Sequence, residues 1–185
     1  EGEIRRSDVE QACQTAKRLV THFERTIIYF KELGFIIDDR DTVMNPLGIF
    51  GVKLEVIAHV VQVRSRFYED WRRLMERARV KKSVPVFSAW STAYGILPAE
   101  SRVKKRLIVD AGHDLISVFV FDNDGITDHR VCLTAGSLNE IGAHSAQVMR
   151  ELIKNNEGIE QFLLTGELAA NDALERILHN NLGIS

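Results

Sequence analysis

Two short segments of this 185-residue chain combine residue types that can hold a metal-bound phosphate. Each is an apolar run that ends in a polar residue near a glycine, namely Ile108-Val109-Asp110-Ala111-Gly112 and Phe162-Leu163-Leu164-Thr165-Gly166. A carboxylate at the end of a strand can hold a metal-bound water, and a glycine turn lets backbone amides approach a phosphate. Asp110, Gly112 and Gly166 are therefore candidate phosphate-binding residues, with Asp110 as the candidate metal ligand. The alternative is two ordinary strand ends with turn glycines.

Other reactive groups show no catalytic or metal-binding spacing. The six histidines are scattered, and no serine or cysteine lies in the sequence context of a nucleophile. Cys13 and Cys132 lie far apart, which argues against a zinc site or a disulfide framework and favours a reducing cytoplasm. We expect both thiols to be buried as small apolar groups. No catalytic residue is predicted, and whether the chain is an enzyme stays open.

The composition is that of a globular protein, with 45% hydrophobic and 27% charged residues and a formal net charge of -2. This charge favours neither nucleic acid nor an anionic membrane, so either partner would need a local patch. The range 64–82 has eight basic against three acidic residues, and we interpret it as a solvated helix face. The sequence contains neither a long apolar run nor a signal-like start. Because it begins at Glu1, we expect a fragment of a longer protein.

Periodicity and turn residues predict the elements that position these candidates. In the first half we expect a helix over 7–20, with Ser7 and Glu10 as its capping pair. The other expected elements there are strands over 26–30 and 35–37, an irregular loop over 45–51, a strand over 52–63, a helix over 64–82 and a strand over 84–87. Phe67, Trp71, Leu74, Met75 and Ala78 form the expected buried face of the second helix.

The second half reads as a meander followed by alternating helix and strand. We expect a helix over 88–97, strands over 106–110, 117–122 and 129–134, a helix over 138–156, a strand over 161–165 and a helix over 171–179 that ends near Gly183. The run Asp122-Asn123-Asp124-Gly125 predicts a hairpin turn. The order of elements is mixed α/β in two parts, and we place the domains at 1–87 and 88–185.

The loop Asn45-Pro46-Leu47-Gly48-Ile49-Phe50-Gly51-Val52-Lys53-Leu54-Glu55, with Ala58-His59-Val60-Val61 after it, resembles a signature of the FtsA family of bacterial actin-like cell-division proteins. That signature is Asn-Pro-x-Gly-Met-x-Gly-x-Arg-Leu-Glu, followed by a strand with a histidine. Val109-Asp110-Ala111-Gly112 resembles the second phosphate motif of the family, and Leu164-Thr165-Gly166 resembles its adenosine motif. Asn45, Pro46, Gly48 and Gly51 are the residues of this loop that we expect to be structural, because Gly48 and Gly51 can hold backbone angles that other residues avoid and Pro46 fixes the approach.

The resemblance implies an α/β fold with a strand-helix-strand-strand (SHS2-like) subdomain and one actin-like, ribonuclease-H-like lobe. It implies ATP and magnesium as cofactors, bound near Asp110, Gly112 and Gly166. It also implies cell-division partners such as FtsZ, self-association, and a place in the cytoplasm at the inner face of the membrane where the cell divides. A first lobe before Glu1, a partner-docking insertion and a membrane-binding tail would be absent, and the chain could be joined across a gap near Ser137.

The departures from the family pattern decide our functional expectation. After Gly112 the family's Gly, Gly, Thr, Thr and Asp are replaced by His113, Asp114, Leu115, Ile116 and Ser117. The glycines expected after Gly166 are Glu167 and Leu168. Since side chains and a carboxylate now crowd the phosphate turn, we expect a division scaffold or adaptor with weak or lost nucleotide binding. The alternatives are an active actin-like ATPase that uses Asp110, or an actin-like platform protein of a secretion or pilus system.

Overall fold

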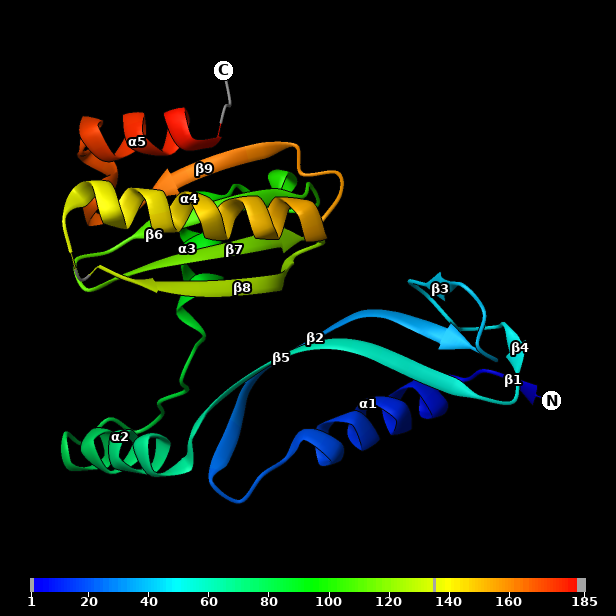
Figure 1. Cartoon of the computed structure of the whole chain (residues 1–185). Coiled ribbons are helices and arrows are strands. Elements are labelled where there is room, and N and C mark those ends of the chain that lie inside the picture. The colour runs from blue at the N-terminus through cyan, green and yellow to red at the C-terminus, as the bar shows by residue number, and fades with distance from the viewer. Residues whose placement is uncertain (1, 135, 183–185) are drawn as a thin grey trace. The chain divides into compact units, whose positions relative to one another are not determined.

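The computed structural model describes residues 2–134 and 136–182 of the chain. Contacts between residues divide the chain into two compact units, Glu1–Phe87 and Ser88–Ser185. Both units combine helices with sheets, as the sequence predicts, and each is considered by itself (Figure 1). No helix in the described part of the chain is long and apolar enough to span a bilayer.

A long antiparallel ribbon forms the first unit, with a helix packed along it (Figure 1). The elements in chain order are β1 (Gly2–Glu3), α1 (Arg6–Val20), β2 (Arg25–Ile37), β3 (Thr42–Val43), β4 (Phe50–Gly51), β5 (Leu54–Arg64) and α2 (Ser65–Arg77). β2 lies between β3 and β5, and β1 pairs with β4. The two-residue strands β1, β3 and β4 are not among the predicted elements.

β2 corrects the prediction of two separate strands over 26–30 and 35–37. The strand continues from Arg25 to Ile37. Its pairing with β5 has register shifts at Ile27/Tyr29 and Glu32/Gly34, which interrupt the alternation of apolar residues without ending the strand. The polar residues between the two apolar runs stay in the sheet because β5 pairs with β2 along almost its whole length. A long partner strand thus overrides the local sequence signal.

The helices of the first unit also differ from the prediction. Ser7 and Glu10 do not cap α1, which begins at Arg6; instead the Asp8 carboxylate accepts a hydrogen bond from the Arg5 N–H at 2.8 Å. α2 ends at Arg77 rather than at residue 82, because Arg79 adopts the left-handed φ of +59°.

The predicted apolar face of α2 and the strand after it are partly wrong. Phe67 and Leu74 are 65% and 58% exposed, whereas Trp71 and Met75 are half-buried. The range 84–87 forms no strand, and Val84 is 78% exposed. The pattern of apolar residues alone could not show that this face has so few partners in the unit.

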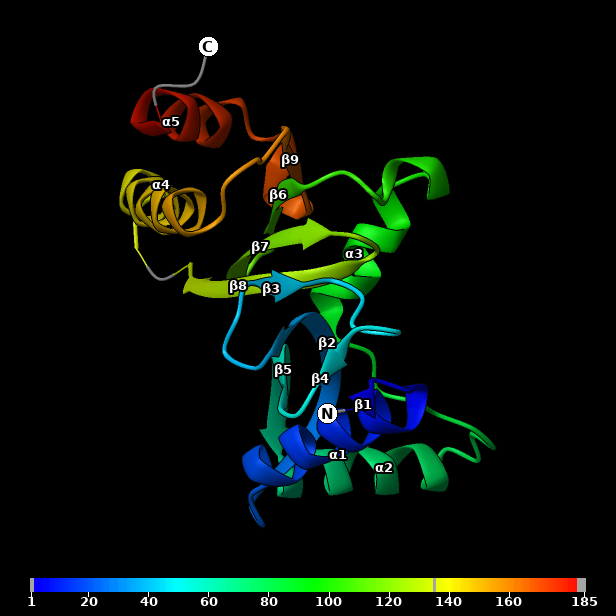
Figure 2. The same cartoon turned by 90° about the vertical axis from the view of Figure 1, so that its right-hand side faces the viewer.

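The second unit is a four-stranded sheet in the order β8-β7-β6-β9. Its elements are α3 (Ser88–Ile96), η1 (Ala99–Ser101), β6 (Arg106–Ala111), β7 (Leu115–Asp122), β8 (Gly125–Leu133), α4 (Leu138–Asn155), β9 (Gln161–Thr165), η2 (Glu167–Ala170) and α5 (Asp172–Leu182). β6, β7 and β8 form the predicted antiparallel meander, and β9 runs parallel to β6. Figure 2 shows α4 and α5 on one face of the sheet and α3 on the other. The predicted helix end near Gly183 lies outside the described residues.

The core of this unit lies between the sheet and the pair α4 and α5. It includes Leu107, Val109, Val118, Val120 and Met149, each at most 3% exposed. The turn between β7 and β8 places Asn123 and Asp124 at φ of +46° and +61°, as the predicted hairpin requires. Cys13 and Cys132 are free and buried, which confirms the expectation for both thiols.

Candidate functional site

The two predicted glycine turns lie side by side at one edge of the sheet. β6 and β9 are parallel neighbours, and Asp110 is the register partner of Thr165. A Cβ on Gly166 would lie 2.7 Å from the Asp110 Oδ1 and 2.6 Å from the Ala111 carbonyl oxygen. Gly166 also has a φ of +94°, so both its backbone angle and its surroundings require glycine. The fold therefore brings Asp110 and Gly166 together.

Asp110 has a hydrogen-bond partner to which the sequence analysis assigned no role. The Thr92 hydroxyl of α3 donates to the Asp110 Oδ2 at 2.7 Å. On the neighbouring strand Ser117 is the register partner of Asp110, and its Oγ lies 2.8 Å from the His129 Nε2 of β8. Thr92, Asp110, Ser117 and His129 thus form a polar row across this end of the sheet. In the sequence, only its position in a predicted helix of small residues could have drawn attention to Thr92.

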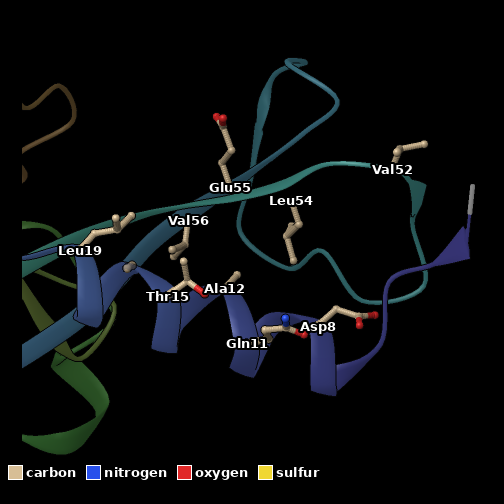
Figure 3. Close-up of a pocket in the computed structure, with 10 residues that line it drawn as sticks. Asp8, Gln11, Ala12, Thr15, Leu19, Val52, Leu54, Glu55 and Val56 are labelled. Carbon is tan, nitrogen blue, oxygen red and sulfur yellow. The ribbon is translucent and has the colours of Figure 1, made fainter.

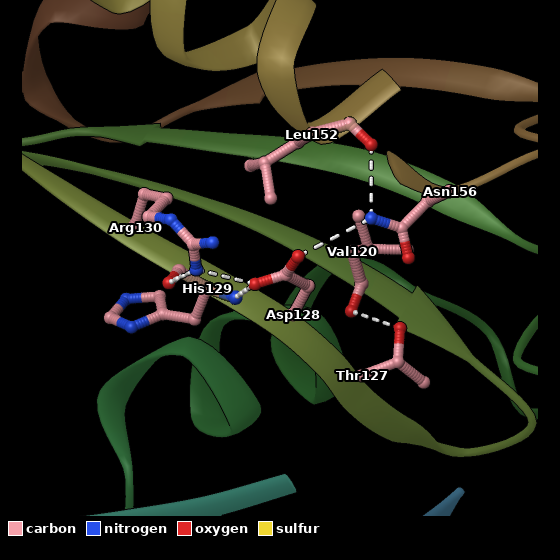
Figure 4. Close-up of polar contacts among 7 residues, drawn as sticks. All are labelled: Val120, Thr127, Asp128, His129, Arg130, Leu152 and Asn156. Carbon is pink, nitrogen blue, oxygen red and sulfur yellow. Dashed lines mark hydrogen bonds and ion pairs between the residues drawn. The ribbon is translucent and has the colours of Figure 1, made fainter. Parts of the chain in front are cut away.

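Hydrogen bonds of Asp128 hold the part of β8 that carries His129 (Figure 4). The Asp128 carboxylate accepts hydrogen bonds from the His129 N–H at 2.8 Å and from the Arg130 guanidinium at 2.6 Å. Its other oxygen accepts from the Asn156 side chain at 3.4 Å, which ties β8 to the end of α4. Hydrogen bonds from the backbone and from neighbouring side chains therefore hold the His129 end of the polar row.

The turn between β6 and β7 is closed by its own hydrogen bonds. The Gly112 N–H donates to the Leu115 carbonyl at 3.0 Å, and the Thr134 hydroxyl donates to the His113 carbonyl at 2.5 Å. His113, Asp114 and Leu115 are exposed. The glycine amide that would face a phosphate is thus already paired, and a carboxylate lies in the same turn.

These residues fit a magnesium–nucleotide complex poorly. In the described residues no group of three or more histidine, cysteine, aspartate or glutamate side chains could hold a metal. Magnesium can manage with one or two carboxylates if substrate phosphates supply further ligands. Asp110 could be one such ligand, but the Gly112 amide is engaged and Glu167 follows Gly166 directly. The chain thus keeps the glycines of both turns, but the amide of Gly112 is already paired.

The predicted structural loop of the first unit is closed by hydrogen bonds. The Asn45 Oδ1 accepts from the Leu47 N–H at 3.2 Å, and the Pro46 carbonyl accepts from the Ile49 N–H at 3.2 Å. Gly48 has the left-handed φ of +80°, and its N–H donates to the Ile4 carbonyl at 3.0 Å. The loop therefore joins the start of the chain to the strand β4.

Gly51 is needed for space and not for its backbone angle, which corrects the expectation for this residue. A Cβ there would lie 2.5 Å from the Ile37 Cγ2 and 3.3 Å from the Asp38 Oδ2. The Asp38 carboxylate in turn accepts from the Lys53 and Val52 N–H groups at 2.8 and 2.9 Å. These backbone hydrogen bonds lower the pKa of Asp38 below its ordinary value.

A groove of about 500 Å³ runs between α1 and the start of β5 (Figure 3). Leu54 and Val56 point toward α1, whereas Glu55 points away from it (Figure 3). The helix side of the groove includes the small side chains Ala12 and Ala16 together with polar ones such as Gln11. The small side chains leave the groove open between the helix and the strand.

Comparisons with known proteins agree with this architecture. Residues 1–62 match the family model of the SHS2 domain inserted in FtsA. Among curated proteins, the cell division protein FtsA of Buchnera aphidicola (subsp. Baizongia pistaciae) is 24% identical over 135 residues, which cover 73% of this chain and 32% of that protein. FtsA of Escherichia coli K12 is 22% identical over 138 residues (75% and 33%), and FtsA of Borreliella burgdorferi is 26% identical over 119 residues (64% and 29%). The chain thus matches about a third of the length of these relatives.

A solved structure extends the likeness to nearly the whole chain. A chain of the PilM-PilN type IV pilus biogenesis complex matches 99% of this chain and 62% of its own length, with a TM-score of 0.65 and 16% identity. At this identity the match shows the fold alone. Together with the SHS2 match it confirms the expected fold class, an SHS2-like unit with one actin-like lobe.

Proposed function

We propose that this chain, as a divergent member of the FtsA family, is a cell-division adaptor. It acts through protein contacts and not through nucleotide turnover. The observation that supports this proposal most is the contrast between the two units. The loop at Gly48 and Gly51 is closed by hydrogen bonds and close packing, whereas in the turn at Gly112 the glycine amide is paired with the Leu115 carbonyl and Asp114 adds a carboxylate. This contrast is expected of a protein that works through its binding surfaces and not through a nucleotide site.

Electrostatics gives the expected strength of nucleotide binding. At an effective dielectric constant of about 20, a carboxylate about 4 Å from a phosphate oxygen costs on the order of 4 kcal/mol. Asp114 lies in the turn that would face the phosphates. We therefore expect any ATP binding to be about millimolar or weaker.

Titration calorimetry of the purified protein with ATP and magnesium tests this expectation. We expect no saturable heat at micromolar ATP. A micromolar dissociation constant that Asp110→Ala abolishes, while Asp172→Ala leaves it intact, would contradict the adaptor and support the ATPase alternative. Asp172 is a suitable control because it is an exposed carboxylate at the start of α5.

The proposed partners are cell-division proteins such as FtsZ, together with a second copy of the protein, and the proposed place is the cytoplasmic face of the membrane at the division site. We assign the groove between α1 and β5 to one of these contacts, because it is open and combines apolar side chains such as Leu54 and Val56 with polar ones such as Gln11. Ala16→Arg should fill the groove and abolish recruitment of a fluorescent fusion to the division site. Arg6→Ala at the exposed start of α1 should leave recruitment unchanged.

The pilus-platform alternative is favoured by one observation, the TM-score of 0.65 to a chain of the PilM-PilN complex. Deleting the gene separates the two functions. Filamentous cells with normal surface fibres support the division adaptor, whereas cells that divide normally but lack pili support the platform.

A further inference from the structure

Three arginines gather at one end of the β2–β5 ribbon. Arg25 and Arg64 face each other as register partners at the end of the two strands. Arg66 follows in the first turn of α2, and its side chain is 95% exposed. With Phe23 they form what we call the arginine tip, which surrounds a pocket of about 540 Å³ together with Glu24 and Ser65.

The positive charge of the arginine tip is largely uncompensated. Arg25 and Arg64 form no ion pair with any residue that the structure describes, and Arg66 is 4.0 Å from Asp70. The only acidic side chain that lines the pocket is Glu24. Like charges directly opposite each other in a sheet destabilise it, so an external anion between Arg25 and Arg64 would relieve a cost that the fold bears alone.

Large apolar side chains project next to these charges. Phe23 is 84% exposed, and Leu19 and Val20 in the last turn of α1 are 82% and 43% exposed. All three lie within five residues of the turn between α1 and β2. A free phosphate ion would offer nothing to these side chains, whereas the boundary between lipid headgroups and acyl chains accepts both arginine and phenylalanine.

The arginine tip is held in place by hydrogen bonds between the two strands and the turn. The Ser65 N–H donates to the Glu24 carbonyl at 2.8 Å, and the Ser65 hydroxyl lies 3.1 Å from that of Thr26. The Gln62 side chain donates to the Val20 carbonyl at 2.6 Å, which fixes the end of α1 against β5. The charges and the apolar side chains are therefore presented together by the folded unit.

We propose that the arginine tip docks on an anionic phospholipid bilayer. The Arg25, Arg64 and Arg66 guanidinium groups bind headgroup phosphates, for which their planar forks are well suited, and Phe23 inserts between the headgroups. Each arginine near an anionic surface contributes about fivefold in affinity, so the docking is weak, reversible and sensitive to salt. This inference is independent of the proposed adaptor function, since it rests on the tip alone.

Co-sedimentation of the whole chain with vesicles tests the proposal. We expect binding to phosphatidylcholine vesicles that contain phosphatidylglycerol, and none to phosphatidylcholine alone. The double variant Arg25→Gln/Arg64→Gln should lose about fivefold for each arginine. Arg73→Gln, an exposed arginine further along α2, is the matched control and should bind anionic vesicles much as the parent does.

Two further measurements keep the test decisive. Phe23→Ser should weaken vesicle binding while the melting temperature stays unchanged, and the double arginine variant should melt no lower than the parent because a repulsion has been removed. If Arg73→Gln by itself loses about fivefold, as much as each arginine of the tip, only net charge matters and the proposal is overturned. If Phe23→Ser has no effect and millimolar inorganic phosphate competes fully, the ligand is a free phosphate and the membrane assignment is wrong.

Discussion

At the scale of single residues, close packing decides which glycines of the first unit are needed. Gly2 and Gly51 are register partners in the β1–β4 pair, yet their surroundings are opposite. A Cβ on Gly2 would meet nothing within 4 Å, whereas one on Gly51 would collide with Ile37 and approach Asp38. Glycines that look alike in the sequence therefore serve different purposes.

Gly51→Val should destabilise the first unit by about 1 to 3 kcal/mol, the usual cost of overpacking a tight site. The added side chain must displace the Ile37 Cγ2, which is 2.5 Å from the new Cβ position. Urea denaturation measures the change, with Gly2→Val as the control because it adds the same side chain to the partner position in open space. If both variants lost the same free energy of unfolding, the cause would be the β1–β4 strand pairing and not the packing around Gly51.

Asp38 gives the first unit a predictable dependence on pH. Because the Lys53 and Val52 N–H groups lower the pKa of the folded state, the ionised carboxylate stabilises the fold above the unfolded pKa. This contribution is lost as the pH falls through the lowered pKa of the folded state. Asp38→Asn should therefore be less stable than the parent at neutral pH and equal to it in strong acid.

Asparagine isolates the charge in this experiment, since its side-chain oxygen can accept the same hydrogen bonds and it tolerates the left-handed φ of +50° at this position. Urea denaturation at neutral and acidic pH gives the two differences in stability. A stability gap that stays the same at both pH values would contradict the role of the Asp38 charge.

At the scale of elements, α2 shows how a helix can be amphipathic and still poorly covered. None of its residues is buried, although Trp71 lines an apolar pocket together with Ile28 and Val63. The helix is anchored mainly through side chains on one side, while Phe67 and Leu74 remain open to solvent. Its stability should depend on a single aromatic anchor.

Trp71→Ala should cost about 2 kcal/mol, less than the roughly 3 to 5 kcal/mol of a fully buried tryptophan, because the side chain is only half-buried. Phe67→Ala should change stability by less than about 1 kcal/mol, since Phe67 is 65% exposed. Thermal unfolding compares the two variants, and Arg73→Glu on the exposed side serves as a neutral control. The assignment of the anchor would be wrong if Phe67→Ala cost as much as Trp71→Ala.

At the scale of the whole molecule, each unit has its own set of internal contacts. The second unit alone contains the cluster of Leu107, Val118 and Leu152 between the sheet and its helices. We therefore propose that 1–87 and 88–185 behave as separate domains. Damage to one core should then leave the other unit folded.

Leu107→Ala should destabilise the second unit by about 2 to 5 kcal/mol, because Leu107 is fully buried. Hydrogen exchange followed by mass spectrometry reports each unit separately. We expect faster exchange in β6, β7 and β9 and unchanged exchange in β2 and β5. Faster exchange throughout both units would contradict the proposal of two domains.

Most of the elements and the fold class could be predicted from the amino-acid sequence. The meander of β6, β7 and β8, the β7–β8 turn and the strand β9 follow from apolar periodicity and turn residues, which are properties of neighbouring positions. The motif at 45–51 resembles one of the FtsA family, and residues 1–62 match the model of the SHS2 domain inserted in FtsA. Burial of Cys13 and Cys132 followed from the ordinary preference of a free thiol.

The contacts between distant elements became visible only in the three-dimensional structure. The pairing of Thr92 with Asp110, the collision that requires Gly51, and the closed amide of Gly112 each join positions that local periodicity does not relate. The same holds for the continuous β2 strand, which its partner β5 maintains, and for the facing pair Arg25 and Arg64. Local patterns depend on a few adjacent residues, whereas site geometry depends on how distant segments pack. The geometry of the site could therefore not be predicted from the local patterns.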